Sequence, residues 1–504
     1  WFVPLDEGTP PERQAAQIAA SRPLAALVVG GDVSRIPGIS TVIDPRAIRG
    51  VRSDFEDAVT DGDSPFYAMF TSGTTGEPRG AVIPHRAVLR LVDDPWFLPG
   101  GPGFRMLHAA PLAFDASTLE IWWPLLNGGT VCCWEGGGAD LGGLHARMQR
   151  DEVRGCWLTA AIFHLAVDAM PEFFQDLDVV LTGGDVVSAD HVRRLLDRRP
   201  EIALINGYGP TENTVFTACE SLVAGGVDRT AIPVGRPIRG SRLRIVDRSG
   251  RDVPPGRFGE LLATGTGVGL GYLGRDGTAR VQEGFERNPR TNEVQYRTGD
   301  RARWQVDGRI EFGGRLDAQV KVSGRRIELG AIETMIRSLP GIRDACATLL
   351  DDGDRSRLAS VVVPEPEREI DAAGIRSALA GRLPEWEVPA VIRIVETIPV
   401  TRNGKPDRRR ISEALLKVNS EEDLAAEAQA SVVGPREGEL LEIVRKAIAE
   451  IASRPSVDSR QSLREIGLDS LDLLRLAIEL ECRVARPVAM VDVLEGGSAM
   501  AIAS

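Results

Sequence analysis

The 504-residue chain has few lysines, few histidines and no long apolar run. Only four of its 60 basic residues are lysines, and the other 56 are arginines. No stretch of 18 apolar residues occurs and no signal peptide opens the chain, so we expect neither a membrane span nor a secretory leader. The net charge of −12, with arginines scattered among acids, argues against a nucleic-acid partner. Because the chain starts at Trp1 rather than Met, we expect it to begin inside a larger protein.

The six cysteines include no Cys-x-x-Cys pair, and the adjacent Cys132 and Cys133 have poor geometry for a disulfide. We expect the cysteines to be small buried hydrophobes of a protein in a reducing compartment, the cytoplasm. The five histidines have no metal-ligand spacing.

Short apolar runs alternate with amphipathic helical stretches from Trp1 to about Gly314. The runs ALVVG, FYAMFTSG, VVLTGG and ALINGYG read as buried strands that end in glycine, and HVRRLLDRR is typical of a helix. Such alternation predicts an α/β domain with largely parallel sheets. The glycines fall at strand ends, where such sheets bind ligands.

The remainder of the chain divides into three regions. Residues 317–415 mix strand-like and helix-like stretches, which predicts a small α+β unit. Residues 416–437 are acidic and Ala-rich, which is typical of a linker with some helical tendency. Apolar residues recur at helical spacing over 438–504, which predicts a small bundle of four helices.

Residues 71–80 read TSGTTGEPRG and directly follow the strand-like FYAMF. Glycines let backbone N–H groups approach an anion, and the four hydroxyls add donors, so the loop suits a polyphosphate. It is not a Walker loop, because no Gly-Lys-Ser/Thr follows the glycines. On its own the stretch is also compatible with a flexible polar turn.

The longer stretch TSGTTGEPRGAVIPHRAV resembles the phosphate loop of the adenylate-forming superfamily. That superfamily includes acyl- and aryl-CoA ligases, luciferases and the adenylation domains of nonribosomal peptide synthetases. Arg79 stands where family members commonly carry Lys. The resemblance implies that ATP phosphates are bound by Thr71, Ser72, Gly73, Thr74, Thr75 and Gly76.

The stretch INGYGPTENTVF resembles the adenine and metal motif of the same family. By this resemblance Asn206 and Tyr208 would hold adenine, and Thr211 would contact the α-phosphate. Glu212 would help to bind Mg²⁺, a hard cation that prefers carboxylate oxygens and substrate phosphates. Taken alone, the stretch could also be a turn with a helix cap.

Two further motifs follow in the family's order. YRTGD ends at Asp300, whose carboxylate would accept hydrogen bonds from the ribose hydroxyls. GRLDAQVKVSGRRIEL would bring Arg315 near the ribose and make Asp317 the hinge between the large and small subdomains. The segment around Gly324 would line the path of an incoming thiol, with Ser323 where Arg is more common.

The stretch PVTRNGKPDRR resembles the family's catalytic-lysine loop, with Lys405 as the catalytic residue. Adenylation joins a carboxylate to the α-phosphate of ATP and expels pyrophosphate. Both partners are anions, so a compact cation between them offsets their repulsion in the transition state. Lys is a point charge whereas Arg is a planar fork, which explains a retained lysine in an arginine-rich chain. The alternative is a surface lysine in a turn.

The stretch IGLDSL resembles the phosphopantetheine attachment site of acyl and peptidyl carrier proteins. Ser470 would lie at a helix N-terminus, where the helix dipole stabilises an attached phosphate. The resemblance implies 4′-phosphopantetheine on Ser470. A fused carrier would supply a tethered thiol at high effective concentration, reached when the small subdomain swings about Asp317.

FDASTLE resembles the place where amino-acid-activating members carry an Asp that pairs with the substrate α-ammonium, here Asp115. Matching position by position, the pocket wall would consist of Asp115, Ala116, Leu119, Trp157, Leu181, Gly183, Gly207, Val215 and Phe216, together with Lys405. Apart from the two charged residues this wall is apolar, so we expect an apolar substrate side chain. The two glycines would leave room for branching.

The pocket set resembles valine-selective pockets. Isoleucine, alloisoleucine and 2-aminobutyrate stay open as substrates, because one methylene gives only about 1–3 kcal/mol of discrimination.

We therefore predict a nonribosomal peptide synthetase adenylation domain fused to a peptidyl carrier domain. The expected parts are an α/β large subdomain with parallel-rich sheets over 1–314, truncated at its start, an α+β small subdomain over 317–415, a linker over 416–437 and an all-α four-helix carrier over 438–504. The chain would form aminoacyl-AMP from ATP, with Mg²⁺, and load the amino acid on the carrier thiol, in the biosynthesis of a peptide natural product such as an antibiotic.

Expected partners are other synthetase modules or tailoring enzymes that act on the carrier, and a phosphopantetheinyl transferase. Bacterial domains of this kind often pair with an MbtH-like protein, although no residue here demonstrates it. One alternative is an acyl- or aryl-acid ligase that loads a carrier, and another is a non-catalytic carrier-presenting scaffold. GLGYLG at residues 269–274 also leaves an NAD-dependent oxidoreductase open, but a lone Gly-x-Gly-x-x-Gly is a weak signal.

Overall fold

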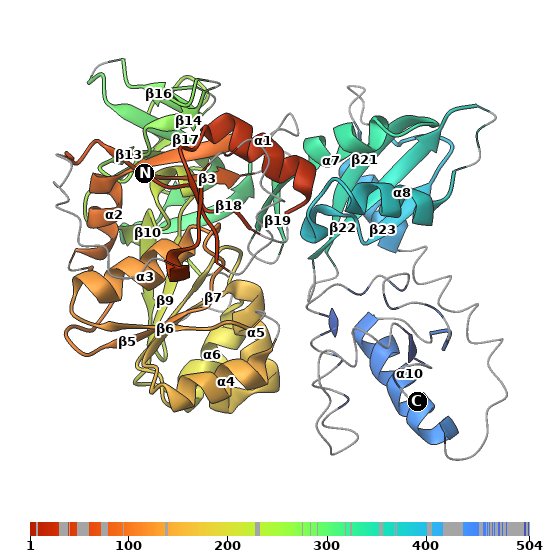
Figure 1. Cartoon of the computed structure of the whole chain (residues 1–504), viewed down its shortest axis with the longest axis horizontal. Coiled ribbons are helices and arrows are strands. Elements are labelled where there is room, and N and C mark those ends of the chain that lie inside the picture. Colours follow the sequence, from red (N-terminus) through yellow and green to blue (C-terminus); the bar gives the residue numbers. More distant parts are fainter. Residues whose placement is uncertain are drawn as a thin grey trace.

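The computed structural model consists of a large N-terminal part, a smaller part and a helical C-terminal part (Figure 1). The residues that it describes are 1–6, 9–29, 39, 41–47, 60–71, 79–93, 95–136, 140–226, 232–274, 276–282, 284–289, 291–317, 319–322, 325–351, 356–366, 368, 370–400, 406–416, 437–452, 457–459, 461, 463, 466, 468, 472–473, 476, 480, 498–499 and 502. None of the helices within these ranges is long and apolar enough to cross a membrane.

A seven-stranded sheet forms the centre of the large part, in the order β11-β10-β9-β8-β7-β5-β6. The pairings from β6 to β9 are parallel, and β10 and β11 extend one edge in antiparallel fashion. The strands are β5 Arg105–His108, β6 Thr130–Cys133, β7 Gly155–Thr159, β8 Val179–Gly183, β9 Ala203–Tyr208, β10 Ala218–Leu222 and β11 Arg236–Pro237. The predicted α/β fold with parallel pairing is confirmed.

Helices cover both faces of this sheet. They are α2 His85–Val92, α3 Ala116–Leu126, α4 Leu141–Arg150, α5 Ala160–Ala169 and α6 Ala189–Arg198, with η3 Pro171–Phe174 after α5. Cys156 and Leu158 of β7 pack against α4, α5 and α6, whereas Trp157 packs on the other face with α2 and α3. Because successive side chains of a strand alternate between faces, a strand covered on both sides is apolar throughout. This explains the continuous apolar run VVLTGG.

Two antiparallel sheets complete the large part. One has the order β12-β13-β17-β16 with β18 also paired to β17, and the other has the order β15-β14-β4-β3. Their strands are β3 Pro65–Thr71, β4 Arg79–Pro84, β12 Ser241–Val246, β13 Gly259–Gly265, β14 Gly271–Leu273, β15 Ala279–Arg280, β16 Phe285–Arg287, β17 Val294–Trp304 and β18 Ile310–Arg315. The GLGYLG stretch therefore lies on β14, which pairs with β4 and β15 and opens no helix. A dinucleotide fingerprint must open a helix, so the oxidoreductase alternative is wrong.

The first elements of the chain form a separate small arrangement. They are α1 Pro11–Ser21, β1 Ala26–Leu27, β2 Val42–Ile43 and η2 Pro45–Ala47. The expectation that ALVVG is a buried strand is wrong, because Leu27 is 72% exposed. Its strand pairs only with the two residues of β2, and this pair is too small to be covered on either face.

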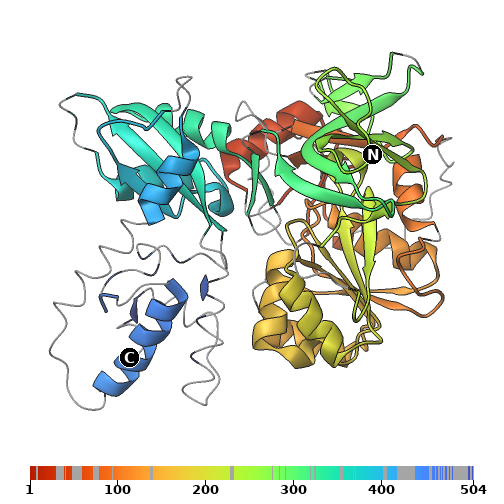
Figure 2. The same cartoon turned by 180° about the vertical axis from the view of Figure 1, so that it is seen from behind.

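The smaller part is the expected α+β unit. Its elements are the hairpin β19 Gln319–Val322 and β20 Arg325–Glu328, then α7 Leu329–Arg337, β21 Ile342–Asp351, β22 Ser356–Pro364, α8 Ala372–Ala380, η5 Glu385–Glu387 and β23 Val391–Ile394. The strands β21, β22 and β23 form one sheet, and α7 and α8 pack against it through a shared apolar core. Both views show α1, in red, between this part and the large sheets (Figure 1, Figure 2). Arg13 of α1 forms an ion pair with Glu387, at 2.7 Å.

In the C-terminal part the described residues include α10 Glu437–Ala452. Val444 and Ile448 of this helix join a core cluster of their own with Leu463, Leu476 and Leu480. The expected linker and most of the expected carrier helices lie outside the described residues. The subdomain boundaries therefore stay predictions.

The cysteines follow the expected pattern with one difference. Cys132, Cys156, Cys219 and Cys346 are free and buried. Cys133 is free but exposed, because it ends the edge strand β6 and points away from the core that Cys132 faces. Cys482 lies outside the described residues.

Phe163→Ala is expected to lower the free energy of unfolding by about 3–5 kcal/mol, because truncating a buried aromatic side chain leaves a cavity. The Phe163 ring is fully buried and contacts Phe174 edge-on. Urea unfolding followed by circular dichroism measures the loss. Val306 is 99% exposed, so Val306→Ala is the control and should change stability by no more than about 0.5 kcal/mol. Equal losses for the two variants would contradict this description of the core.

Candidate active site

A cavity of about 570 Å³ lies where the parallel strands β7 and β9 end. Ligand sites in open α/β sheets lie at the carboxyl ends of the strands, and this volume is typical of a small-molecule pocket. The cavity is also bordered by the start of α3, by residues of α1 and by the hairpin β19–β20. Of the residues that the sequence nominated, those lining it are Thr71, Asp115, Ala116, Trp157, Asn206, Gly207, Tyr208, Thr211, Val215, Phe216, Asp300 and Arg315.

Several nominated residues are near the cavity without lining it. Leu119 and Leu181 are fully buried in the core between the sheet and α3. Contrary to the expectation from the sequence, they are not part of the cavity wall in this structure. Glu212 and Asp317 form ion pairs with the cavity-lining residues Arg326 and Arg315, and Gly183 of β8 lies opposite Gly207 of β9 in the sheet. The phosphate-loop residues Ser72, Gly73, Thr74, Thr75 and Gly76, the lysine Lys405 and the carrier residue Ser470 lie outside the described residues.

The two glycines do not open extra space on the side where a side chain would point. A Cβ on Gly183 would lie 2.1 Å from the Gly207 carbonyl oxygen, and one on Gly207 would lie 2.3 Å from the Phe216 ring. In the direction in which a side chain would point, the space at these glycines is therefore filled by backbone and by Phe216. These glycines allow close packing of β8, β9 and the Phe216 ring, which corrects the expectation from the sequence.

One wall of the cavity is a strained loop. The short helix η4 Thr211–Asn213 ends at Thr214 and Val215, whose φ angles are 57° and 61°. Left-handed conformations of non-glycine residues cost about 1–3 kcal/mol each and persist only where the surroundings enforce them. The Thr214 hydroxyl donates to the Gly267 carbonyl at 2.9 Å, and the Thr217 N–H donates to the Tyr208 carbonyl at 2.7 Å. This loop carries Val215 and Phe216 into the cavity wall.

Asp115 is a buried carboxylate at the first turn of α3, next to Ala116 in the cavity wall. It forms no ion pair within the part of the chain that the structure describes. Burial raises the pKa of its carboxyl to about 6, and the Glu212 charge adds to the rise, while a hydrogen bond from the Thr211 hydroxyl opposes it. A carboxylate that is charged at neutral pH, buried and unpaired suits a cationic ligand.

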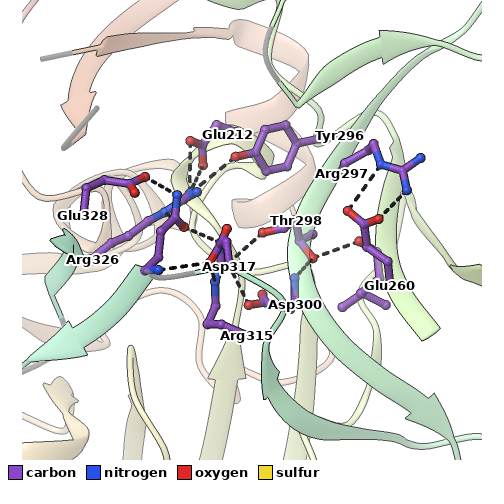
Figure 3. Close-up of polar contacts among 12 residues, drawn as sticks. Glu212, Glu260, Tyr296, Arg297, Thr298, Asp300, Arg315, Asp317, Arg326 and Glu328 are labelled. Atoms are coloured by element: carbon purple, nitrogen blue, oxygen red, sulfur yellow. Dashed lines mark hydrogen bonds and ion pairs between the residues drawn. The ribbon is translucent and has the colours of Figure 1, made fainter. Parts of the chain in front are cut away.

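Tyr208, Asp300 and Arg315 form a hydrogen-bonded chain along the same cavity. The Tyr208 hydroxyl donates to Asp300, and Arg315 donates to the other Asp300 oxygen at 2.7 Å. Arg315 also binds both oxygens of Asp317, at 3.0 and 2.6 Å, as Figure 3 shows. Burial, with the Asp300 charge, raises the pKa of Tyr208, so its hydroxyl remains a donor. The predicted ribose and adenine contacts and the predicted hinge are thus brought together in one cluster.

Glu212, the expected metal ligand, is 1% exposed and bound by two donors. One terminal nitrogen of Arg326, from β20, contacts its two oxygens at 3.2 and 3.3 Å (Figure 3). The Tyr272 hydroxyl donates to the same carboxylate at 2.5 Å. Within the described residues no group of three or more His, Cys, Asp or Glu side chains could hold a metal ion. A single carboxylate fits Mg²⁺, which takes most of its ligands from water and substrate phosphates. In this structure Arg326 and Tyr272 contact the Glu212 oxygens that such an ion would need.

Sequence reasoning missed three cations of the hairpin β19–β20. Lys321, Arg325 and Arg326 all line the cavity. The Lys321 ammonium lies 5.8 Å from the centre of the Tyr208 ring, and the Arg325 guanidinium stacks 3.5 Å from that of Trp386. The adjacent arginines in GRRIEL and the rarity of lysine were the available signals.

Comparison with family models covers most of the chain. Residues 1–273 match the AMP-binding enzyme model, residues 331–405 match the AMP-binding enzyme C-terminal domain and residues 442–504 match the phosphopantetheine attachment site.

Curated relatives include a linear gramicidin synthase of Brevibacillus parabrevis, 35% identical over 86% of this chain and 8% of the relative. A plipastatin synthase of Bacillus subtilis (strain 168) is 33% identical over 95% of this chain and 18% of the relative. The chain therefore spans less than a fifth of the length of these relatives.

Among solved structures, the chain resembles holo-PA1221, described as a nonribosomal peptide synthetase protein with adenylation and carrier domains bound to a vinylsulfonamide inhibitor. The TM-score is 0.83 at 30% identity, covering 99% of this chain and 82% of that one. The artificially fused adenylation–carrier didomain NpsA-ThdA from Klebsiella oxytoca gives a TM-score of 0.69 at 25% identity, covering 84% and 81%.

Asp115→Asn is expected to stabilise the free protein at pH 8 by on the order of 3 kcal/mol. The pKa of Asp115 is raised to about 6 in the folded state, so the folded protein binds the proton more tightly than the unfolded chain does. The buried charge therefore costs most above pH 6, and the cost fades as the pH falls through 6 toward 4. Chemical unfolding at pH 8 and pH 5 measures the difference between wild type and variant. A difference that does not shrink at pH 5 would contradict the buried, unpaired carboxylate.

Proposed function

The chain belongs to the AMP-binding enzyme family, as a nonribosomal peptide synthetase adenylation domain fused to a phosphopantetheine carrier domain, and from this premise we propose that it activates an amino acid and loads it onto its own carrier. It is an adenylate-forming ligase that uses ATP and Mg²⁺ and carries 4′-phosphopantetheine. The proposed first step forms aminoacyl-AMP and releases pyrophosphate. The proposed second step transfers the aminoacyl group to the carrier thiol and releases AMP.

The observation that carries the proposal is the buried carboxylate of Asp115 in the cavity wall. An α-amino acid brings an ammonium group that would pair with Asp115 and compensate its burial. A simple acyl or aryl acid brings no cation, and its binding would leave this carboxylate buried and unpaired. This asymmetry favours an amino acid over the acyl- or aryl-acid alternative.

The nucleotide half of the site would use the chain of polar residues beside the cavity. We propose that Tyr208 and Asn206 hold adenine, that Asp300 and Arg315 bind the ribose, and that Thr211 contacts the α-phosphate. Their common position on the cavity wall supports these roles. The remaining proposed phosphate contacts come from residues 71–76.

Charge in the reaction would be managed by two groups. Lys405 would lie between the substrate carboxylate and the α-phosphate, where a point charge offsets their repulsion. Glu212 would hold Mg²⁺, which when bound neutralises charge on the phosphates. The Arg326–Glu212 contact supports two arrangements of the small subdomain, related by rotation about Asp317. In one of them Mg²⁺ would neutralise the Glu212 carboxylate, and in the other, the one seen here, Arg326 neutralises it.

For the substrate we propose L-valine or a closely related aliphatic amino acid. The side chains that line the cavity near Asp115 are apolar: Ala116, Trp157, Val215 and Phe216. An apolar wall favours an apolar side chain, because a polar group would lose its hydrogen bonds to water there. The depth of the pocket between these residues then limits how large the substrate side chain can be.

For the carrier we propose Ser470 as the attachment site, charged by a phosphopantetheinyl transferase, with the subdomain boundaries near residues 314–317 and 415–438. Other synthetase modules or tailoring enzymes would accept the loaded amino acid. An MbtH-like protein would be a further partner.

Amino-acid-dependent ATP–pyrophosphate exchange, with a panel from glycine to phenylalanine, tests the proposed function. Strong exchange is expected with valine or a near relative. Asp115→Ala should lower kcat/KM for the amino acid by about 30-fold or more, because removing one partner of a buried charge pair costs about 2–5 kcal/mol. Asp252→Ala is the control, since that carboxylate pairs with Arg244 at an exposed position. Exchange that is driven as well by acids without an amino group would refute the amino-acid assignment.

Arg326→Met is expected to tighten the binding of the Mg²⁺ that supports exchange. A hydrogen bond to a charged group contributes about 1.5–3 kcal/mol, so losing this competitor should lower the half-saturating Mg²⁺ concentration by about ten-fold. Thioester loading, followed by mass spectrometry of the holo-chain, should slow at the same time. Arg325→Met is the matched control, because Arg325 stacks on Trp386 and forms no ion pair with Glu212 in the described structure. Identical Mg²⁺ titrations for wild type and Arg326→Met would contradict the competition.

A further inference from the structure

Arg90 is a buried arginine beneath the substrate pocket, and no step proposed above uses it. It lies on α2, is 8% exposed and forms no ion pair with an acid among the described residues. Burial lowers the pKa of its guanidinium to about 10. A buried cation without a counter-ion is retained only where its hydrogen bonds compensate its desolvation.

Those hydrogen bonds converge on the strained loop of the pocket wall. One terminal nitrogen of Arg90 donates to the Phe216 carbonyl at 2.8 Å and to the Ser241 hydroxyl at 2.8 Å. The other donates to the carbonyls of Asn213 at 2.9 Å and Thr214 at 3.1 Å. Three carbonyls of one four-residue segment are therefore held by one rigid side chain.

The carbonyls held in this way lie in and on both sides of the strained stretch of backbone. Thr214 and Val215 have φ angles of 57° and 61°, and Val215 is β-branched, which makes this conformation rare. The guanidinium fills the space between this loop and Gly267, where a Cβ would lie 2.5 Å from it. With the carbonyls released, the loop would relax toward ordinary φ values and withdraw its side chains.

We propose that Arg90 is a positioning residue that sets the side-chain selectivity of the pocket, by holding the strained loop that carries Val215 and Phe216 into the cavity wall. This inference rests on the proposed amino-acid pocket. The fork geometry of Arg is required, because its two terminal nitrogens reach carbonyls on both sides of Val215, whereas the ammonium of Lys is a single point.

The test measures ATP–pyrophosphate exchange by the full chain with glycine, alanine, 2-aminobutyrate, valine, isoleucine, leucine and phenylalanine. In Arg90→Met, the ratio of kcat/KM between the best substrate and the larger amino acids is expected to fall about ten-fold, the size of a one-methylene discrimination. The KM for ATP should change much less than the KM for the amino acid. Arg90→Lys should lie between wild type and Arg90→Met.

The matched control is Arg86→Met, one turn earlier on the same helix. Arg86 also binds backbone carbonyls, those of Thr266 at 2.7 Å and Val268 at 3.1 Å, but none in the pocket loop. Its substrate ratios should stay at the wild-type values. Should Arg90→Met fail to fold, Ser241→Ala removes one anchor of the guanidinium and should shift the ratios in the same direction by a smaller factor.

The outcomes separate this inference from the proposed function. Wild-type exchange with amino acids, together with unchanged substrate ratios in Arg90→Met or in Ser241→Ala, would overturn the role of Arg90 and leave the proposed function standing. Absence of exchange by the wild type with any amino acid would overturn both. A broadened substrate range in the Arg90 variants but not in Arg86→Met is the supporting result.

Discussion

The covering of both faces of the parallel sheet is the constraint on which the rest of the structure depends. With α4, α5 and α6 on one face and α2 and α3 on the other, polar chemistry can reach the sheet only where its strands end. The cavity lies at that edge, and the side chains that line it come from segments far apart in the chain. Most charged groups at this edge are half-buried or buried and form ion pairs, and these pairings hold neighbouring segments together, whereas Asp115 forms no ion pair among the described residues.

Arginine dominates these pairings for a geometric reason. Arg315 joins Asp300 to Asp317, Arg326 joins Glu212 to Gln319 through two different nitrogens, and Arg90 holds several carbonyls of the pocket loop. Each position has two or more acceptors spread over a plane, which a guanidinium matches and an ammonium does not. The few lysines are consistent with the same logic, because a lysine is useful where charge is wanted at one point.

Strand–helix alternation and the order of the motifs were enough to predict the α/β fold and the gathering of Asp115, Tyr208, Asp300 and Arg315 around one cavity. The direction in which each side chain points, and how deeply it is buried, could not be predicted from the sequence. Leu119 and Leu181 face the core, and the space at Gly183 and Gly207 is filled, because these outcomes depend on how α3 and Phe216 pack on the sheet. The Arg326–Glu212 contact joins residues 114 positions apart, and local sequence carries no trace of such a pairing.

The unpaired carboxylate of Asp115 has a consequence for the heat of ligand binding. At a pH below about 6 the Asp115 carboxyl carries a proton. A ligand cation that pairs with this carboxylate must displace the proton into solution. Ligand and proton are then competitors for one site, so the measured enthalpy includes the heat of protonating the buffer. Comparing buffers of different ionisation enthalpy would count the protons released, and the count should rise as the pH falls through 6.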